Sequence, residues 1–446
     1  MRNIDDILKL PTFSKTIGLD RAKDILFHLQ LNRCAFPWVH IAGTKGKGST
    51  SVFIANILHA SGYKVGLFLS PHLQKIEERI SINLETMDPS LLSSHYNDLA
   101  SMLPTEKWDQ LNYFETLTIL AFYIFTKEKV EVAVIETGLG GRLDATNSVE
   151  NPILTVLSTL GYDHTERLGT SLSSITYEKA GIMKTGVPII SASQEVKAAD
   201  IIEKEAQLMR SKYVSLENHY KIENVSSNKD WDPEKFSVTS CATNKNYPDL
   251  QTILFGKHQI QNATLALASA EELKNTFPEI NTNSIREGIT KAFIPGRFEH
   301  LIDPRNPNIT IIADGAHNPE SAKTLTQTLK ERFLKKKIYF LVGILKNKQM
   351  AEMVHSFLEV AHFFQFTTIP YHDTYKEQDY KNEWEKQNAK VCFAFSEDWQ
   401  KAYNEVSCRL TKNDLLCICG SLYLVGQMRE SFHYKACSSY EKKVGG

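Results

Sequence analysis

The sequence predicts an α/β protein in which a P-loop domain with a doubly wound, mainly parallel sheet is followed by a smaller Rossmann-like α/β domain. Two observations support this fold class. Short, almost wholly apolar segments alternate with helical stretches, and the alternation starts again after a turn at residues 294–297. Such strands are typical of parallel sheets that helices cover on both faces. In addition, a glycine-rich loop follows the first apolar segment and precedes a helical one.

The expected elements of the first domain follow from hydrophobic periodicity. Residues 1–35 are expected to be helical with a turn at Gly18, and further helices are expected over Ser51–Ala60 and Tyr113–Thr126. The expected strands are Trp38–Ala42, Val65–Leu69, Val132–Glu136, Ile153–Ser158 and Pro188–Ser191.

The domain boundary is expected at the Pro295-Gly296 turn, which gives domains over residues 1–294 and 295–446. Residues 216–252 are polar, rich in Asn, Ser, Lys and Asp, and weakly periodic, so we expect a small irregular or antiparallel β region at the edge of the first domain. Helix Gly256–Leu273 precedes the boundary. The strands expected in the second domain are Ile309–Ala313, Ile338–Val342, Phe363–Thr367, Val391–Phe395 and Leu415–Cys419, and the polar tail from Ser431 is expected to fray.

Composition and charge narrow the class of protein. The 446 residues include 51 basic and 52 acidic side chains, so the charge balance gives no reason to expect binding to nucleic acid or to an anionic membrane. Seven scattered cysteines without a Cys-x-x-Cys pair predict reduced thiols in a cytoplasmic protein. Residues 1–10 carry charges unlike a signal peptide, and no apolar run reaches membrane-spanning length. With no apolar stripe that demands a partner, a monomer is expected.

The glycine-rich loop Gly43–Thr50 is a variant of the Walker A phosphate loop. Its glycines let backbone N–H groups approach an anion, and the N-terminus of the following helix adds positive potential. Lys47 can reach terminal phosphates, and a hydroxyl of Ser49-Thr50 can face phosphate or Mg²⁺. The strict pattern has glycine where Ile41 stands and Ser or Thr where Gly48 stands. An ordinary strand-to-helix turn is the alternative, but it does not explain a lysine between two glycines.

Polar residues follow three strands of the first domain. Ser70 comes after the second strand, Glu136 ends the third with the geometry of a Walker B carboxylate, and Asp163-His164 follow the fourth. Because the carboxyl ends of parallel strands face one crevice, Ser70, Glu136 and His164 are candidate Mg²⁺ ligands. A Ser-Pro turn and a structural histidine are the alternatives.

The second domain repeats this pattern. Asp314 and His317 follow its first strand and are expected to point into the crevice between the domains, and Ser421 follows its last strand. In the first domain, Glu178–Lys184 is a helix end with two lysines. A solvated charge cluster is the alternative, and the spacing does not exclude it.

Together these motifs resemble the folylpolyglutamate synthase/dihydrofolate synthase family, a branch of the Mur ligases. Lys45 departs from this family, which usually carries Asn at that position, and the sequence leaves the effect open. The matching motifs lie in order over almost the whole chain: Gly43–Thr50, Ser70–Leu73, Glu78–Ile80, Phe114-Glu115, Glu136–Asn147, Asp163–Gly169, Glu178–Lys184, His258–Asn262, Pro295–Arg297, Asp314–Pro319 and Gly420–Tyr423.

The resemblance implies a site for ATP and a site for two Mg²⁺ ions. Residues that match nucleotide-binding positions are Gly43, Thr44, Gly46, Lys47, Gly48, Ser49, Thr50, Asn262, Arg297 and Asp314. Residues that match Mg²⁺ ligands are Ser70, Glu136, His164 and Lys179. Lys179 matches a family lysine that is carbamylated, and this carboxylate helps to hold the second ion.

The resemblance also implies sites for the other two substrates. Residues that match the pterin site are Thr16, Ile17, Gly18, Leu19, Asn112, Tyr113, Phe114, Glu115, Leu143, Asp144 and Ala145. His317 and Ser421 lie where the incoming glutamate is expected. Residues that match catalytic positions are Lys47, Lys179, Asp314 and His317.

The implied reaction is that of an ATP-dependent acid–amino-acid ligase. ATP phosphorylates a pteroyl carboxylate, the amine of L-glutamate attacks the acyl phosphate, and phosphate leaves. We expect the bifunctional enzyme, which makes dihydrofolate from dihydropteroate and also lengthens the glutamate tail of tetrahydrofolate. The alternatives are a monofunctional folylpolyglutamate synthase, a Mur ligase acting on a UDP-sugar peptide, a P-loop ATPase that drives motion, and an inactive relative acting as a binding module.

Overall fold

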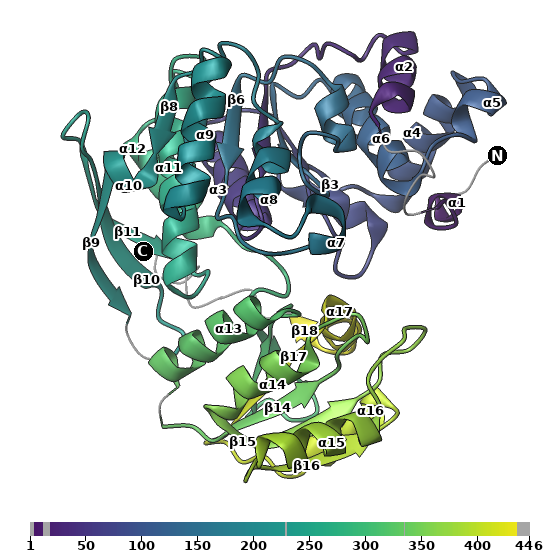
Figure 1. Ribbon diagram of the computed structural model, residues 1–446, viewed down its shortest axis with the longest axis vertical. Coiled ribbons are helices and arrows are strands. Elements are labelled where there is room, and N and C mark those ends of the chain that lie inside the picture. Colours follow the sequence, from purple (N-terminus) through teal and green to yellow (C-terminus); the bar gives the residue numbers. More distant parts are fainter. Residues whose placement is uncertain (1–3, 12–17, 228–229, 334, 435–446) are drawn as a thin grey trace. The chain divides into compact units, whose positions relative to one another are not determined.

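The computed structural model describes residues 4–11, 18–227, 230–333 and 335–434, and Figure 1 shows their helices and strands. The chain divides into two compact units. The first comprises Met1–Ser226, Glu234–Ile253 and Lys257–Phe293, and the second comprises Ser227–Pro233, Leu254–Gly256 and Ile294–Gly446. In the described ranges, no helix combines the length and the apolar character that crossing a membrane requires.

The first unit contains an eight-stranded sheet in the order β4-β3-β2-β5-β1-β6-β7-β8. The strands β2, β5, β1, β6, β7 and β8 run parallel to one another, whereas β3 and β4 add an antiparallel edge beside β2. The central strand β1 lies between β5 and β6, so the loops that follow these three strands lie at one edge of the sheet. The bounds are β1 Trp38–Ala42, β2 Val65–Phe68, β3 Ile80–Ile82, β4 Glu85–Thr86, β5 Val132–Glu136, β6 Leu154–Leu157, β7 Ile189–Ser191 and β8 Tyr213–Ser215.

Helices cover both faces of this sheet, which explains why its strands are almost wholly apolar. On one face, Trp38 packs edge-to-face on Phe122 of α6, and Ala42 shares a buried cluster with Ile202 of α9. On the other face, α3 packs on β1, β2 and β5, while α11 packs on β6 and β7. The helices of this unit, including two short 3₁₀ helices η1 and η2, are α1 Asp5–Leu8, α2 Asp20–His28, α3 Lys47–Ala60, η1 Ile76–Arg79, α4 Pro89–Ser101, α5 Thr105–Trp108, α6 Tyr113–Lys127, η2 Ala145–Ser148, α7 Thr165–Leu168, α8 Leu172–Ala180, α9 Val196–Leu208, α10 Leu216–His219, α11 Lys257–Leu273 and α12 Thr282–Lys291.

The polar segment 216–252 forms α10 and a separate three-stranded sheet in the order β11-β10-β9. Its strands are β9 Tyr220–Ser227, β10 Glu234–Ser240 and β11 Asn246–Thr252, and β10 pairs with β11 in an antiparallel manner. Phe236, Val238, Tyr247 and Leu250 are buried. By contrast, Lys235, Asn246 and Asp249 are exposed. The sheet therefore buries an apolar face, and its strands β10 and β11 contact α11. One-sided burial alone would give a regular alternation of apolar and polar residues. A register shift between Phe236 and Val238 interrupts this alternation, which explains the weak periodicity of the segment.

The second unit contains a seven-stranded sheet in the order β16-β15-β14-β17-β13-β12-β18, in which β12 runs antiparallel to its two neighbours. Trp231 stacks on His300 with ring centroids 4.1 Å apart, and Phe255 meets Phe298 at 5.6 Å, so two short segments from earlier in the chain join this unit. Its elements are β12 Glu299–Ile302, β13 Thr310–Ala313, α13 Pro319–Arg332, β14 Ile338–Val342, α14 Met350–Leu358, β15 Ala361–Thr367, α15 Glu377–Gln387, β16 Cys392–Ser396, α16 Trp399–Ser407, β17 Leu415–Cys419, α17 Leu422–Ser431 and β18 His433–Tyr434.

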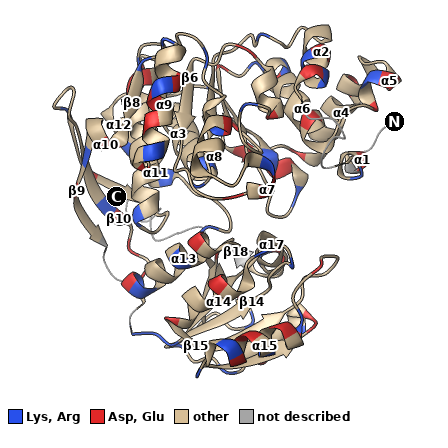
Figure 2. Cartoon of the chain, in the orientation of Figure 1, with Lys and Arg blue, Asp and Glu red and all other residues tan. Residues whose placement is uncertain are grey.

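Charged residues of both signs alternate along the exposed helices, as α9 and α15 show in Figure 2. Within α15, Lys381 forms an ion pair with Glu377 one turn away, at 2.8 Å. In these helices, the basic and acidic side chains, which the sequence contains in nearly equal numbers, are mixed rather than separated.

The structure confirms the predicted fold class, two α/β units with mainly parallel sheets, and places every predicted strand within two residues of its expected bounds. Several details of the prediction were wrong. The short edge strands β3, β4, β8, β12 and β18 were not expected, because two to four residues carry too little periodicity. Helix α3 begins at Lys47 rather than Ser51, and β18 lies in the tail that was expected to fray.

We expect Gly288→Ala to destabilise the first unit, because a Cβ at this position of α12 would lie 2.5 Å from the backbone of Ile57 in α3. Overpacking of this kind costs about 1–3 kcal/mol, and the gain of about 1 kcal/mol from better helix propensity offsets it only in part. Urea unfolding measures the difference. Glu287→Ala, a neighbouring exposed substitution, is the control, and an unchanged unfolding midpoint in Gly288→Ala would contradict the packing argument.

Candidate functional site: a phosphate loop beside a buried lysine

The phosphate loop is held in place by backbone contacts to the strand end beside it. The N–H groups of Thr44 and Lys45 both donate to the carbonyl of Thr159, each at 3.0 Å. Gly46 has φ +80°, and a Cβ there would lie 2.2 Å from Oδ1 of Asn262 in α11. Only glycine fits this left-handed position against a buried amide. The resemblance placed Asn262 at the nucleotide, and the structure brings it against the loop.

The first turn of α3 can bind an anion. No side chain caps this helix, so its leading N–H groups are available to phosphate oxygens. Ser49 and Thr50 are buried, and the hydroxyl of Thr50 has no hydrogen-bond partner among the described residues. A buried, unsatisfied hydroxyl at the start of such a helix fits an oxygen-rich group such as a nucleotide phosphate with its cation.

Glu136 at the end of β5 faces the same helix start. Its Oε1 lies 3.8 Å from Nζ of Lys47, and its side chain is almost fully buried. The N–H of Ser70 donates to Oε2 of Glu136 at 3.0 Å. The structure therefore brings together three of the predicted residues, a lysine, a carboxylate and a serine. Mg²⁺ in phosphate sites is typically held by one or two carboxylates, water and the substrate phosphates, which fits this small set of donors.

The loop after Ser70 is built on a second carboxylate. Glu78 accepts hydrogen bonds from the backbone N–H groups of Leu73, Gln74 and Lys75, at 2.7–2.9 Å. Burial and the charge of Arg79, whose Nε donates to Nδ1 of His72 at 2.9 Å, lower the pKa of His72 to about 4. His72 is therefore neutral at neutral pH and accepts this hydrogen bond.

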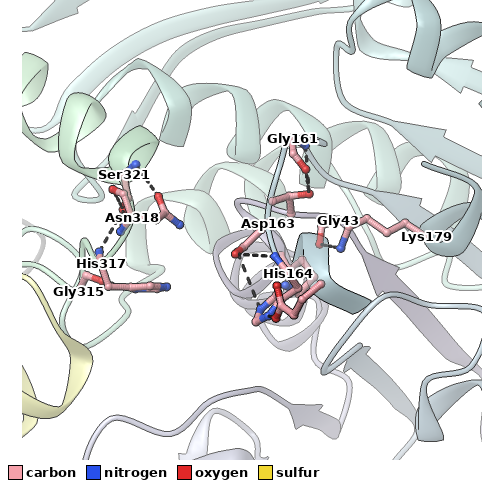
Figure 3. A network of polar contacts seen from close by, with 12 residues as sticks. Gly43, Gly161, Asp163, His164, Lys179, Gly315, His317, Asn318 and Ser321 are labelled. Atoms are coloured by element: carbon pink, nitrogen blue, oxygen red, sulfur yellow. Dashed lines mark hydrogen bonds and ion pairs between the residues drawn. The ribbon is translucent and has the colours of Figure 1, made fainter. Parts of the chain in front are cut away.

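His164 lies in the loop after β6 with φ +50°, and its side chain is 47% exposed. Figure 3 shows it beside Asp163, whose carboxylate accepts the backbone N–H of His164 at 3.0 Å. The ring nitrogens lie 3.7–4.0 Å from carboxylate oxygens of Glu166 and Asp163. In the described part of the chain, His, Cys, Asp and Glu side chains form no group of three that could hold a metal alone. The role of His164 as a Mg²⁺ ligand stays a prediction.

Lys179 near the end of α8 is a buried amine. Its Nζ donates to the carbonyl of Gly43 at 2.7 Å, as Figure 3 shows, and only 4% of the residue is exposed. Burial, reinforced by the charge of Lys47, lowers the pKa of Lys179 to about 7, against the opposing effect of Asp163 and Asp144. A large fraction of this amine is therefore unprotonated at neutral pH, which makes it able to react as a nucleophile.

The glycine-rich loop after Glu136 is anchored by Asp144. The carboxylate accepts the N–H of Leu139 at 2.7 Å, the N–H of Thr146 at 3.1 Å and the hydroxyl of Thr146 at 2.6 Å. Burial raises the pKa of Asp144 against these hydrogen bonds. Leu143, by contrast, is 38% exposed. The structure thus shows Asp144 supporting its own loop, and its predicted contact with substrate stays a prediction, as do those of Leu143 and the buried Ala145.

The predicted pterin residues on α6 have structural partners. Asn112 and Glu115 form a reciprocal cap at the start of α6, and Glu115 also pairs with Arg21 at 2.9 Å. Phe114 packs so closely on the loop after β5 that a Cβ on Gly138 would lie 2.5 Å from its ring. Tyr113 lies under the guanidinium of Arg79, at 5.2 Å. Thr16 and Ile17 lie outside the described residues, whereas Gly18 and Leu19 directly precede α2.

In the second unit, Asp314 organises the start of the loop after β13. Its carboxylate accepts the N–H groups of Phe298 and Ala316, each at 2.9 Å. Burial raises the pKa of Asp314, opposed by the charge of Arg297. A Cβ on Gly315 would lie 2.7 Å from the Arg297 guanidinium, so this glycine leaves room for it.

The two residues predicted to contact glutamate lie in the same unit. Nδ1 of His317 lies 2.7 Å from the carbonyl of Gly315, and the backbone N–H of His317 donates to the hydroxyl of Ser321 at 3.1 Å (Figure 3). Because a carbonyl only accepts, Nδ1 carries the proton of this hydrogen bond. The buried hydroxyl of Ser421 accepts the N–H of Tyr423 and so caps α17. Their roles in glutamate binding stay predictions.

Comparison with known proteins decides the family. Residues 41–270 match the Mur ligase middle domain, and residues 299–431 match the dihydrofolate synthetase C-terminal domain. The dihydrofolate synthase/folylpolyglutamate synthase of Bacillus subtilis is 34% identical over 418 residues, which are 93% of this chain and 94% of that protein. The chain belongs to the dihydrofolate synthase/folylpolyglutamate synthase family of Mur ligases.

Solved structures of this ligase family share the fold. The crystal structure of folylpolyglutamate synthase from Thermotoga maritima matches with a TM-score of 0.82 and 29% identity, over 96% of this chain and 95% of that one. The structure of Escherichia coli FolC in complex with DHPP and ADP matches with a TM-score of 0.81 and 26% identity, over 95% of each chain. The enzymes of this family use ATP to form their products.

Sequence reasoning did not identify three buried polar residues of the first unit as parts of the site. His40 and Thr146 are completely buried, and Nε2 of His40 lies 2.8 Å from the hydroxyl of Thr146. Thr137 follows Glu136, and its buried hydroxyl has no hydrogen-bond partner in the ranges that the structure describes. The only signal in the sequence was His40 itself, a histidine inside an apolar strand, and this signal did not identify Thr146 as its partner.

We expect the stability of this protein to rise with pH above 7 because of Lys179. Its pKa is about 7 when folded and near 10.5 when unfolded, so between these values the unfolded chain binds the extra proton and folding becomes more favourable as pH rises. In CO₂-free buffer, Lys179→Met should remove this dependence and be more stable than wild type at pH 6.5. The gain in unfolding free energy of the variant over wild type should be about 2 kcal/mol larger at pH 6.5 than at pH 9.

Urea unfolding at the two pH values measures this effect. Lys197→Met, at an exposed position of α9, is the control that should keep the wild-type dependence. Equal pH dependence in wild type and Lys179→Met would show that Lys179 does not hold a depressed pKa.

Proposed function

We propose that this chain is a bifunctional ligase that joins L-glutamate to pteroyl carboxylates, making dihydrofolate from dihydropteroate and lengthening the glutamate tail of tetrahydrofolate. The observation that carries the proposal is the uncapped start of α3, where Lys47 faces Glu136 and the buried Lys179 amine contacts Gly43. The whole-length match to a relative that bears both activity names supports two activities. The E. coli relative bound to DHPP and ADP supports a pterin substrate and a nucleotide.

The chemistry requires an activated carboxylate. Bound ATP with Mg²⁺ supplies the phosphoryl group that converts the poorly electrophilic carboxylate into an acyl phosphate. The N–H groups of Lys47, Gly48 and Ser49 bind phosphate oxygens, and the Lys47 ammonium neutralises charge that develops on the transferring group. Thr44, Gly43, Gly46 and Thr50 complete the phosphate loop. The amine of L-glutamate then attacks the acyl carbon, and phosphate leaves the tetrahedral intermediate.

We propose that two Mg²⁺ ions bind beside this loop. Ser70, Glu136 and His164 are the proposed protein ligands of one or both ions, with water and phosphate oxygens completing the shells. The neutral amine of Lys179 is proposed to attack CO₂. The N–C bond forms as one C=O bond becomes a single bond to oxygen, the nitrogen releases one proton to solvent, and a carbamate of charge −1 results beside Lys47. The depressed pKa of Lys179 supports this step, because only the neutral amine can attack CO₂.

The pteroyl group is proposed to bind beside Phe114 and the loop 137–147. Phe114 offers a ring edge against Gly138, and the half-exposed Leu143 offers apolar area on the same loop. The further residues proposed for this site are Thr16, Ile17, Gly18, Leu19, Asn112, Tyr113, Glu115, Asp144 and Ala145.

The two domains are proposed to have different roles. Residues 1–294 form the ATP-binding domain, and residues 295–446 form the glutamate-ligase domain. Asn262 from the first domain, and Arg297 and Asp314 from the second, are the proposed nucleotide contacts. His317 and Ser421 are proposed to bind the incoming glutamate. We further propose a cytoplasmic monomer acting on small molecules, because the most exposed apolar side chains of the described residues are scattered. They are Phe27, Val196, Leu208 and Tyr371, of which Val196 and Leu208 lie at opposite ends of α9.

We expect purified protein to release phosphate from ATP with Mg²⁺ and L-glutamate when either dihydropteroate or tetrahydrofolate is the acceptor. Phosphate release with tetrahydrofolate alone would support a monofunctional folylpolyglutamate synthase instead. Folded protein that releases phosphate with neither acceptor would contradict the proposed function. Lys47→Ala should abolish turnover with both acceptors, whereas the exposed Lys197→Ala should not change it.

We expect activity to depend on dissolved CO₂ if Lys179 is carbamylated. Protein depleted of CO₂ at mildly acidic pH and returned to pH 8 should be weakly active and recover on addition of bicarbonate. ¹³C-bicarbonate should give a carbamate resonance in wild type that is absent from Lys179→Met. Full activity without CO₂, and no carbamate resonance, would show that Lys179 acts as a free amine.

A further inference from the structure

A completely buried chain of hydrogen bonds connects the phosphate-loop strand to the glycine-rich loop. His40 of β1 lies 2.8 Å from the hydroxyl of Thr146, and this hydroxyl lies 2.6 Å from the carboxylate of Asp144. Thr146 and Asp144 belong to η2 and its N-cap, respectively. At most 5% of each of the three residues is exposed.

Chemistry fixes the direction of this chain. Asp144 accepts three hydrogen bonds from Leu139 and Thr146, which is the behaviour of a carboxylate. Thr146 has one hydroxyl proton, which it gives to Asp144, so its oxygen accepts from His40. Burial holds the pKa of His40 well below its usual value, so the ring is neutral with its proton on Nε2. The chain therefore runs from His40 through Thr146 to Asp144.

Among the described residues, the ring of His40 makes one hydrogen bond, the one to Thr146. Nδ1 has no hydrogen-bond partner among the described residues, and the ring lies 4.9 Å from that of Trp38 in an apolar cluster. An apolar ring would fill the same space without leaving a buried nitrogen unsatisfied. The stability of the core alone therefore does not explain a histidine, whereas the single hydrogen bond to Thr146 does.

The loop 137–147, at the Asp144 end of this chain of hydrogen bonds, needs such an anchor. Residues 138, 140 and 141 are glycines, which contribute no side chains to hold the loop. Asp144 closes it through the N–H of Leu139. The Asn147 amide donates to the carbonyl of Arg142 within the loop and to that of Gly181, the C-cap of α8, each at 3.0 Å. Arg142, beside Leu143, is also held by Glu178 of α8, through its N–H at 2.7 Å and its guanidinium at 2.6 Å. Both sets of anchors position Leu143 in the middle of the loop.

We propose that His40 and Thr146 are positioning residues that set the loop 137–147 for binding of the pteroyl substrate, while the phosphate loop is held independently. This inference rests on the proposed function. The phosphate loop has its own anchors, namely the Thr159 carbonyl and the Lys179 amine, both of which bind to loop backbone. Loss of the His40–Thr146 contact should therefore impair one substrate more than the other.

The test is a comparison of KM values in Thr146→Val, which keeps the branched shape and removes the hydroxyl. We expect the KM for the pteroyl acceptor to rise at least about ten-fold while the KM for ATP stays within about two-fold, since small displacements of a substrate-positioning group have large kinetic effects. Thr146→Ser, which keeps the hydroxyl, should restore most of the affinity.

Thr326→Val is the matched control, because it removes a buried hydroxyl that donates to the carbonyl of Ser356 in the second unit. It should lower the melting temperature without moving either KM. Unchanged KM values in Thr146→Val, or an equal rise for ATP, would overturn the inference. If Thr146→Val does not fold, His40→Gln and His40→Phe make the same comparison, with only the phenylalanine variant expected to raise the pteroyl KM. Wild-type protein inactive with every pteroyl acceptor would overturn the proposed function itself.

Discussion

The hydrogen bond from the Lys179 amine to the carbonyl of Gly43 joins the end of α8 to the phosphate loop, and most of the site is arranged around it. A buried ammonium is expensive to remove from water, and here a second cation, Lys47, lies near enough to lower the same pKa. The interaction is stable because the amine can lose its proton. The site thus combines Lys47 at the helix start with the buried Lys179 amine, which can change its charge.

Close backbone contacts let the loops of this site meet. Gly46 turns beside Asn262, and Gly141 approaches the carbonyl of Lys179 so closely that a Cβ would lie 2.8 Å from it. Glu136 stands between the two loops and contacts Lys47 and Ser70. These contacts depend on the parallel order of β2, β5, β1 and β6, which places four strand ends at one edge of the sheet.

Carboxylates in both units support loops by accepting backbone N–H groups. Glu78, Asp144 and Asp314 each bind two or more such donors, and each follows or precedes a strand end. A loop that must present backbone to a ligand has few side chains of its own to pack, so an acceptor within the loop holds its shape. Residues of this kind look like ligand contacts in a sequence, because both roles require a buried polar side chain.

The sequence by itself determined the alternation of apolar strands and helices, the phosphate loop and the family motifs, because these depend on local periodicity and on short runs of glycine and polar residues. It located the strands β1, β5, β14 and β17 to the residue. Only the tertiary structure decided the order of the strands, the short antiparallel edges and the partners of buried polar groups. His40 and Thr146 are 106 residues apart, and nothing in local sequence relates them. Likewise, the depressed pKa of Lys179 arises from burial and from neighbours distant in the chain, which no motif contains.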